Sequence, residues 1–181
     1  MVYMFYLGLS ISCNVRVGNA LGANDPKRAR VAAFLTIGMA TTTAVCCASF
    51  ILVNRARLPL WFTHDELITD LATRILIVAA FFQVPDSVNG TVQGIFRGSG
   101  RQVLGAKLNF VAYYLLGIPL GCLIAFHWDA GVIGLWMGMT AGLLLVAITG
   151  TYIVGQSDWS ALAKDAQARV KRDSIVEAHL L

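Results

Sequence analysis

Charged side chains are scarce in this sequence. Asp, Glu, Lys and Arg together make up 13% of its 181 residues, whereas 57% of the residues are hydrophobic. The mean hydropathy is +0.68. Such a composition excludes an ordinary soluble domain, which needs a largely polar and charged surface, and it indicates a protein whose solvent is the lipid bilayer.

The sequence also lacks the clusters of reactive side chains that enzymes and metal sites need. The three histidines occur singly, and the four cysteines lie in apolar runs without the spacing of a metal site or a disulfide framework. The segment Arg97-Gly98-Ser99-Gly100 lacks the lysine and the spacing of a phosphate-binding loop. We therefore expect a protein that is not an enzyme and that holds no metal and no cofactor.

Apolar runs of membrane-spanning length are plentiful. A hydrocarbon core of roughly 30 Å requires about 20 apolar residues of helix. The expected fold is an all-α polytopic membrane helix bundle over residues 1–155, followed by a tail over 156–181. The bundle has four full spans and one partial N-terminal span, predicted at 31–53, 67–95, 104–126 and 131–154, with the partial span at about 1–21.

Short polar motifs mark where two of the spans begin. Asp25 followed by Pro26 places an N-cap residue before a proline at the first helical position. Thr63 and Glu66 have the spacing of a capping box, in which each side chain accepts a hydrogen bond from the other residue's backbone amide. We expect helices to start directly after Asp25 and Thr63.

The tail beginning near residue 157 has a helical pattern of its own. Trp159, Leu162, Ala166 and Val170 recur at helical spacing, and the basic residues of the tail lie largely elsewhere around the axis. This pattern is typical of an amphipathic helix on a membrane surface. A polar extension that frays in solvent is the alternative, and the sequence leaves both open.

Lys and Arg residues are divided unequally between the two sides of the membrane. Of the 14, three fall on one side, at Arg55, Arg57 and Arg74. The other side receives Arg16, Lys27, Arg28, Arg30, Arg97, Arg101, Lys107, Lys164, Arg169, Lys171 and Arg172. Because cytoplasmic loops are enriched in these residues, the loops near Lys27 and Arg101 and the C-terminus are expected in the cytoplasm. Charges spread over separate loops also argue against a nucleic-acid partner.

Glycines at four-residue spacing predict close helix packing between the last two spans. Gly134, Gly138 and Gly142 lie on one face of the span 131–154, and Gly117 and Gly121 lie on one face of the preceding span. Faces of small residues let two helix backbones approach each other in a membrane. We expect these two spans to pack against each other.

The span 67–95 carries the most informative polar residues. At about 100° per residue, Gln83, Asp86, Asn89 and Gln93 fall within an arc of roughly 120°. A carboxylate near mid-membrane costs about 2.5 to 3.5 kcal/mol on insertion scales, so Asp86 is expected to face a cavity or a partner. A proton and an arriving cation would compete for this carboxylate, which is the minimum chemistry of an antiporter. A structural carboxylate satisfied by a neighbouring helix is the alternative.

Several segments resemble the multidrug and toxic compound extrusion (MATE) family. The similarity runs from about residue 10 to the pair Asp158-Trp159. The segments that carry it are RVGNALGA at 16–23, NDPK at 24–27, QGIFRGSGRQ at 93–102, GAKLNFVAYYLLGIPLG at 105–121 and GVIGLWMG at 131–138. Their order and spacing are those of the eukaryotic members of the family.

The resemblance implies a fold and a function. Members have twelve spans in two six-helix bundles, and this chain would supply a C-terminal fragment, namely the end of the second bundle's second span and the four spans after it. The N-terminal bundle would be its missing partner. The implied function is a secondary active antiporter that exports drugs or organic cations in exchange for protons or sodium, with the ion gradient in place of a cofactor.

The resemblance also implies site residues and a location. Asp86 matches the acidic residue that eukaryotic members carry in their tenth span, and Tyr113 and Tyr114 match an aromatic pair in the eleventh. A multi-pass protein of the plasma membrane or of a vacuolar or other internal membrane is expected. Two alternatives stay open, which are a non-transporting truncated or structural membrane subunit, and a lipid-type flippase of related architecture.

Overall fold

The chain folds into long helices joined by short turns, in a computed structural model that describes residues 2–63 and 65–180. Residues 1, 64 and 181, which belong to the predicted partial span, the loop before the span 67–95 and the tail, lie outside the described residues. The helices are α1 (Val2–Gly22), α2 (Pro26–Asn54), α3 (Glu66–Gly98), α4 (Gln102–Phe110), α5 (Ile118–Cys122), α6 (Gly131–Gln156) and α7 (Trp159–Leu180). The π-helical segment Val111–Gly117 joins α4 to α5, and a second one, Leu123–His127, extends α5, so that all four form one rod.

Four helical segments in the described part of the chain are long and apolar enough to cross a membrane. They are Pro26–Asn54, Glu66–Gly98, Gln102–His127 and Gly131–Gln156. Their outward surfaces are apolar, and large side chains such as Leu115, Ile148 and Tyr152 are each more than 60% exposed. The predicted all-α, multi-pass membrane bundle is confirmed. Helix α2 begins before its apolar run because the basic residues after Pro26 form its first turn.

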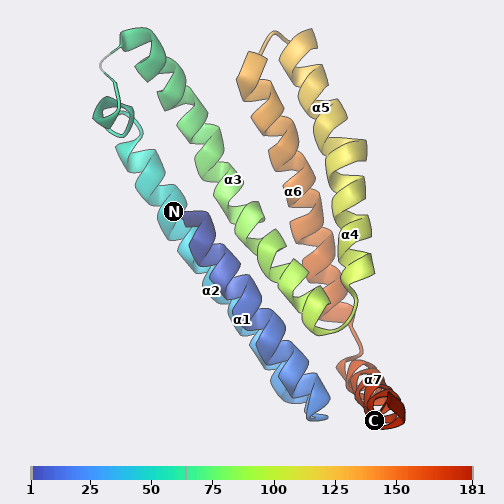
Figure 1. Cartoon of the computed structure of the whole chain (residues 1–181). Helices are drawn as coiled ribbons and strands as arrows, with labels where there is room; N and C mark the ends of the chain where they lie inside the picture. Colours follow the sequence, from blue (N-terminus) through green and yellow to red (C-terminus); the bar gives the residue numbers. More distant parts are fainter. Residues whose placement is uncertain (1, 64, 181) are drawn as a thin grey trace.

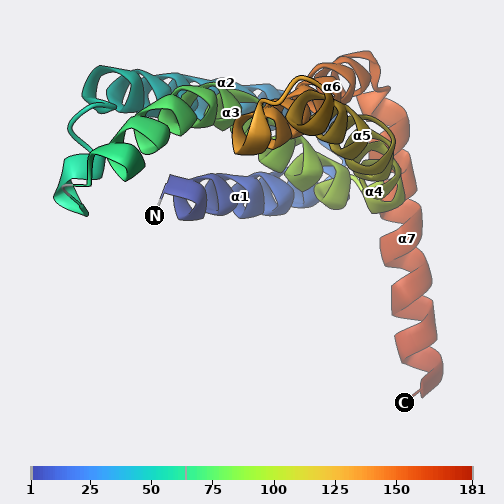
Figure 2. The ribbon, with the colours of Figure 1, turned by 90° about the horizontal axis from the view of Figure 1, so that it is seen from above.

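Helix α3 lies at the centre of the assembly. It packs against α1, α2 and α6. Figure 1 shows that α1 runs beside only the half of α2 and α3 that lies nearer the α1–α2 turn. Viewed from above, α1 occupies one side of the α2–α3 pair, and α7 leaves the bundle at a steep angle (Figure 2). Polar residues in the lower half of α3 are therefore enclosed by α1.

The cap predicted at the start of α2 is present, whereas the capping box predicted at the start of α3 is not. The Asp25 carboxylate accepts a hydrogen bond from the Arg28 backbone N at 3.0 Å, which confirms Asp25 as the N-cap of α2. The predicted capping box at Thr63 is wrong. Helix α3 is capped by Asp65, whose carboxylate accepts hydrogen bonds from Leu67 N at 2.9 Å and Ile68 N at 3.3 Å. Asp is the stronger N-cap residue, so the helix starts at Glu66 rather than directly after Thr63.

The glycine face of α6 packs on the α4–α5 rod, as predicted. Gly134, Gly138 and Gly142 are buried. A Cβ atom added at Gly138 would lie 2.5 Å from the carbonyl oxygen of Gly117, and one at Gly142 would lie 2.6 Å from that of Ala112. Backbones in such close contact leave no room for a side chain, so glycine is required along this interface.

The α4–α5 rod widens just before its proline. The backbone N of Ile118 donates to the carbonyl of Tyr113, five residues earlier, as in a π-helix. Pro119 follows directly and has no amide hydrogen to donate. The wider turn accommodates the proline ring within a continuous rod, and the two buried glycines of this region, Gly117 and Gly121, face α6.

The sequence left two structures open for the tail, a helix on the membrane surface and a frayed extension. The first turns of α7 fit neither. Trp159, Ala163 and Ala166 are buried, in contacts that α7 makes with α1 and α2. Arg169 also donates a hydrogen bond to the carbonyl of Ser99 in the α3–α4 turn, at 3.2 Å. Val170, which the sequence pattern assigned to the apolar face, is 60% exposed. The start of the tail is therefore part of the folded bundle rather than a lipid-surface helix or a frayed extension.

Candidate functional site

A polar pocket of about 340 Å³ lies between α1, α3 and the rod of α4 and α5. Helix α3 supplies its floor because Asp86, Asn89 and Gln93 recur at spacings that place them on one face of the helix. The lining residues are Tyr3, Tyr6, Leu7 and Ser10 of α1, Asp86, Asn89, Gly90, Gln93 and Arg97 of α3, and Tyr113 of the first π-helical segment. Three helical elements thus enclose one half-buried carboxylate.

Four of the six predicted site residues line this pocket, namely Asp86, Asn89, Gln93 and Tyr113. Gln83, one turn before Asp86 on α3, is not among the residues that line it. Tyr114 is not among them either. Its side chain is 61% exposed and stacks on Phe110, with ring centroids 5.0 Å apart. Adjacent residues of a helix point in different directions, so only Tyr113 of the pair faces α3.

The Asp86 carboxylate is free of protein partners. It makes no hydrogen bond and no ion pair with any residue in the described part of the chain. The Tyr6 hydroxyl, on a side chain that is 3% exposed, lies within hydrogen-bonding reach of the Cys47 thiol of α2. Buried polar groups in proteins are nearly always hydrogen-bonded. A pocket that holds an unpaired carboxylate therefore has the capacity to bind a polar or charged ligand.

Gln93 fixes the shape of the pocket floor. Its Nε2 donates to Asn89 Oδ1 at 3.3 Å and to the Gly105 carbonyl of α4 at 3.4 Å. A Cβ atom at Gly105 would collide with the Gln93 side chain. Gln93 thus lines the pocket, orients the Asn89 side chain and connects α4 to α3.

Arg97 closes the end of the pocket away from Asp86. Its guanidinium donates to Ser10 Oγ at 2.9 Å, and Ser10 in turn donates to the Gly90 carbonyl. Arg97 follows Asp86 by 11 residues, which is about 16 Å along a helix axis. At this separation the guanidinium does not neutralise the carboxylate, and the pocket has a positive end and a negative end.

Sequence reasoning missed the wall that α1 contributes. Tyr3, Tyr6 and Ser10 were not predicted because the sequence analysis identified this segment only as a partial span. The available signal was the pair Gly94 and Gly98 on α3. A Cβ atom at Gly94 would collide with the Ser10 backbone, and one at Gly98 would lie 2.6 Å from the Asn14 carbonyl. Glycine spacing thus marked the face of α3 that receives α1.

Comparisons with known sequences point to one group of proteins. The family model MatE matches residues 1–123. "Multidrug and toxin extrusion protein 1" of Danio rerio is 34% identical over 167 residues, which cover 92% of this chain and 28% of that protein. "Protein DETOXIFICATION 31" of Arabidopsis thaliana is 30% identical over 168 residues, which cover 93% of this chain and 32% of that protein. The chain thus spans less than a third of the length of these relatives.

Solved structures agree with the sequence comparisons. The chain superposes on the crystal structure of the eukaryotic MATE transporter AtDTX14 with a TM-score of 0.87 and 30% identity, over 93% of this chain and 38% of that one. It also superposes on an inward-facing multidrug resistance MATE transporter of the MOP superfamily with a TM-score of 0.76, over 88% of this chain and 37% of that one. At 20% identity, the second match supports the fold alone.

Proposed function

Since the chain belongs to the MatE family, we propose that it forms part of the C-terminal bundle of a secondary antiporter that exports drugs or organic cations. This proposal rests chiefly on the pocket, in which the Asp86 carboxylate has no hydrogen-bond or ion-pair partner from the described residues. The side chains of Tyr3, Tyr6 and Tyr113 line the same pocket. A carboxylate attracts a cation, and aromatic rings bind the apolar and cationic parts of the same molecule.

Asp86 is proposed to couple the movement of substrate to that of an ion. A carboxylate that binds a proton gives up its attraction for an organic cation, and one that binds the cation gives up the proton. The two ligands are therefore carried in alternation, which is exchange rather than co-transport. Sodium would compete in the same way. The carboxylate performs no bond chemistry in this scheme, in keeping with a transporter rather than an enzyme.

A transport measurement tests this proposal. The complete transporter that contains this chain is reconstituted in lipid vesicles with an acidic interior, and uptake of radiolabelled tetraethylammonium is followed. We expect uptake that stops when a protonophore collapses the pH gradient. Uptake that follows a sodium gradient instead would assign sodium as the coupling ion. Movement of a lipid-linked molecule without cation uptake would favour a flippase, and no movement at all would favour a structural subunit.

The remaining bundle is proposed to be part of the same polypeptide. The chain spans 28% to 32% of the relatives compared above, and twelve spans of about 20 residues with their loops require roughly 450 residues. An antibody against residues 164–172 of α7 is expected to detect a membrane protein of about that length in the source cell. A band near 19.5 kDa would contradict the proposal and would require a separate partner chain.

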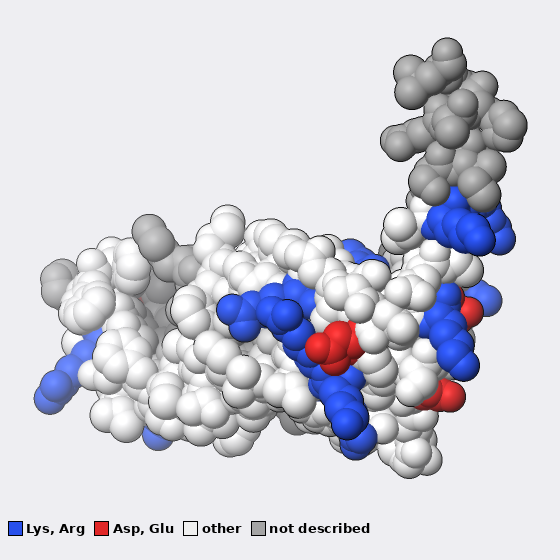
Figure 3. Space-filling model, turned by 90° about the horizontal axis from the view of Figure 1, so that it is seen from below, with Lys and Arg blue, Asp and Glu red and all other residues white. Residues whose placement is uncertain are grey.

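The orientation is proposed from the charges, and the membrane from the family resemblance. Figure 3, seen from the end where α1 meets α2 and α3 meets α4, shows Lys and Arg side chains gathered over this end and on α7. The cytoplasm is the side that such charges favour. We place this end and the C-terminus in the cytoplasm, in the plasma membrane or in a vacuolar or other internal membrane.

A further inference from the structure

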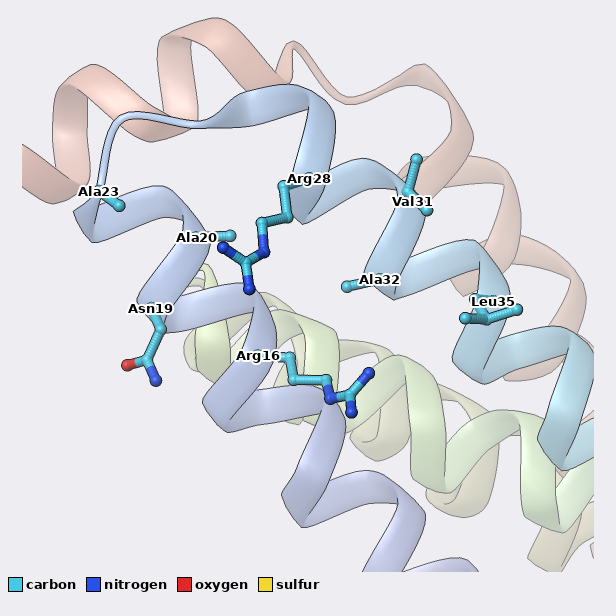
Figure 4. A pocket seen from close by; sticks show the side chains of 8 residues that line it. All are labelled: Arg16, Asn19, Ala20, Ala23, Arg28, Val31, Ala32 and Leu35. Carbon is cyan, nitrogen blue, oxygen red and sulfur yellow. The ribbon is translucent and has the colours of Figure 1, made fainter.

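A second cavity, of about 550 Å³, lies between α1 and α2 close to the turn that joins them. Figure 4 shows the guanidinium groups of Arg16 from α1 and Arg28 from α2 extending into the space between the two helices. Small side chains, including Ala20 and Ala32, line the space beneath them. The small side chains of these alanines leave the space open where the two helices meet.

The cavity is electropositive. Neither Arg16 nor Arg28 forms an ion pair with any residue that the structure describes. The Asp25 carboxylate, at the start of α2, accepts the backbone N–H of Arg28 rather than its side chain. Lys27 adds a further positive charge beside the cavity, on the same first turn of α2. Unpaired guanidinium groups favour phosphate, whose oxygens accept two parallel hydrogen bonds from each group.

An apolar surface continues from the cavity along α2. Val31 and Leu35 line the cavity and also a hollow of about 710 Å³ that includes Phe34. Leu35 further lines a third hollow, of about 480 Å³, that extends to Thr43. The distance from residue 31 to residue 43 along the helix axis is about 18 Å. This length is close to half of a hydrocarbon core of roughly 30 Å, so the surface spans one leaflet of a bilayer.

We propose that the α1–α2 cavity binds the headgroup of an anionic phospholipid from the adjacent leaflet, with an acyl chain lying along α2. A phosphate at the membrane surface joined to an apolar chain matches a pair of arginines at one end of an apolar hollow. The cavity shares no lining residue with the Asp86 pocket. The lipid site is therefore independent of the transport proposal, and it stands or falls on its own test.

Native mass spectrometry of the complete transporter that contains this chain, purified in detergent, tests the proposal. Dioleoylphosphatidylserine is titrated against dioleoylphosphatidylcholine, and we expect phosphatidylserine to bind more tightly. The double variant Arg16→Gln and Arg28→Gln is expected to weaken phosphatidylserine binding by about 25-fold, since each arginine near a membrane surface contributes about fivefold. The matched control, Arg57→Gln at the opposite end of α2, is expected to change nothing.

A second variant separates a cavity from diffuse surface charge. Ala23→Phe fills part of the cavity and keeps both arginines, and it is expected to weaken phosphatidylserine binding while circular dichroism shows unchanged helix content. Equal binding of the two lipids, unchanged binding by either cavity variant, or an equal loss in Arg57→Gln would overturn the proposal. Displacement of the lipid by millimolar inorganic phosphate would show that the site binds free phosphate rather than a lipid headgroup.

Discussion

Replacement of Asp86 by asparagine in the complete transporter is expected to lower gradient-driven uptake of an organic cation at least tenfold. The substitution keeps the shape of the side chain and removes its charge. Opposite unit charges about 4 Å apart attract by about 4 kcal/mol at an effective dielectric near 20, and about 1.4 kcal/mol corresponds to a tenfold change in binding. Because no residue in the described chain pairs with Asp86, the lost attraction belongs to the ligand.

Asp70→Asn is the matched control for this measurement, because Asp70 is on the same helix. Its carboxylate is 65% exposed and pairs with Arg74 at 3.0 Å. Exposed ion pairs of this kind contribute about 0 to 1 kcal/mol, so the control is expected to transport normally. Asp86→Glu is expected to retain part of the activity, since it keeps a carboxylate. If Asp86→Asn exchanges protons for cations at the normal rate, Asp86 is a structural carboxylate and the coupling hypothesis fails.

Substitution of Gly138 by alanine is expected to lower the stability of the bundle by about 1 to 3 kcal/mol, the usual cost of overpacking. The new methyl group would meet the Gly121 backbone and lie 2.5 Å from the Gly117 carbonyl oxygen. Backbone atoms cannot rotate away as a side chain does. Helix α6 and the α4–α5 rod must separate, and the contacts along their whole interface weaken. Thermal unfolding in detergent, followed by circular dichroism, measures the effect.

Gly155→Ala, on the same helix, is expected to have no destabilising effect on the bundle, in contrast to Gly138→Ala. A Cβ atom at Gly155 has no neighbouring atom within 4 Å. Alanine at this position lowers the conformational entropy of the unfolded chain and causes no clash in the folded one. The temperature midpoint of unfolding is therefore expected to stay the same or to rise, with a gain in stability of up to about 1 kcal/mol. Equal midpoints for the two alanine variants would show that the interface between α6 and the α4–α5 rod tolerates a wider separation than its geometry implies.

Features that depend on local sequence were predicted well. Continuous apolar runs require a membrane helix wherever they occur, and Asp25 before Pro26 favours a helix start in any context. The glycine face of α6 was also recognisable, because glycine at four-residue spacing has few other uses in a membrane helix.

Features that depend on distant parts of the chain were not predictable. The choice of Tyr113 over Tyr114 follows from where the α4–α5 rod packs, and a family pattern that contains both cannot distinguish them. Tyr6 reaches the pocket only because α1 packs alongside α3. Docking of the tail depends on Trp159 packing against a surface that two separate helices, α1 and α2, create. Helical periodicity identifies a face of a helix but does not identify what covers it.

Three arginines, in the last turn of α3, the α3–α4 turn and α7, make polar contacts between separate segments of the chain. Arg97 of α3 donates to Ser10 of α1 at 2.9 Å, Arg101 donates to Ser157 at 2.9 Å, and Arg169 donates to the Ser99 carbonyl at 3.2 Å. The opposite end has a longer contact, from Thr73 Oγ1 to the Arg55 carbonyl at 3.4 Å. We therefore expect the helices to move less relative to one another near the α3–α4 turn than near the end of α2. A spectroscopic label at position 57 would register this motion, whereas the same label near position 101 would stay almost still.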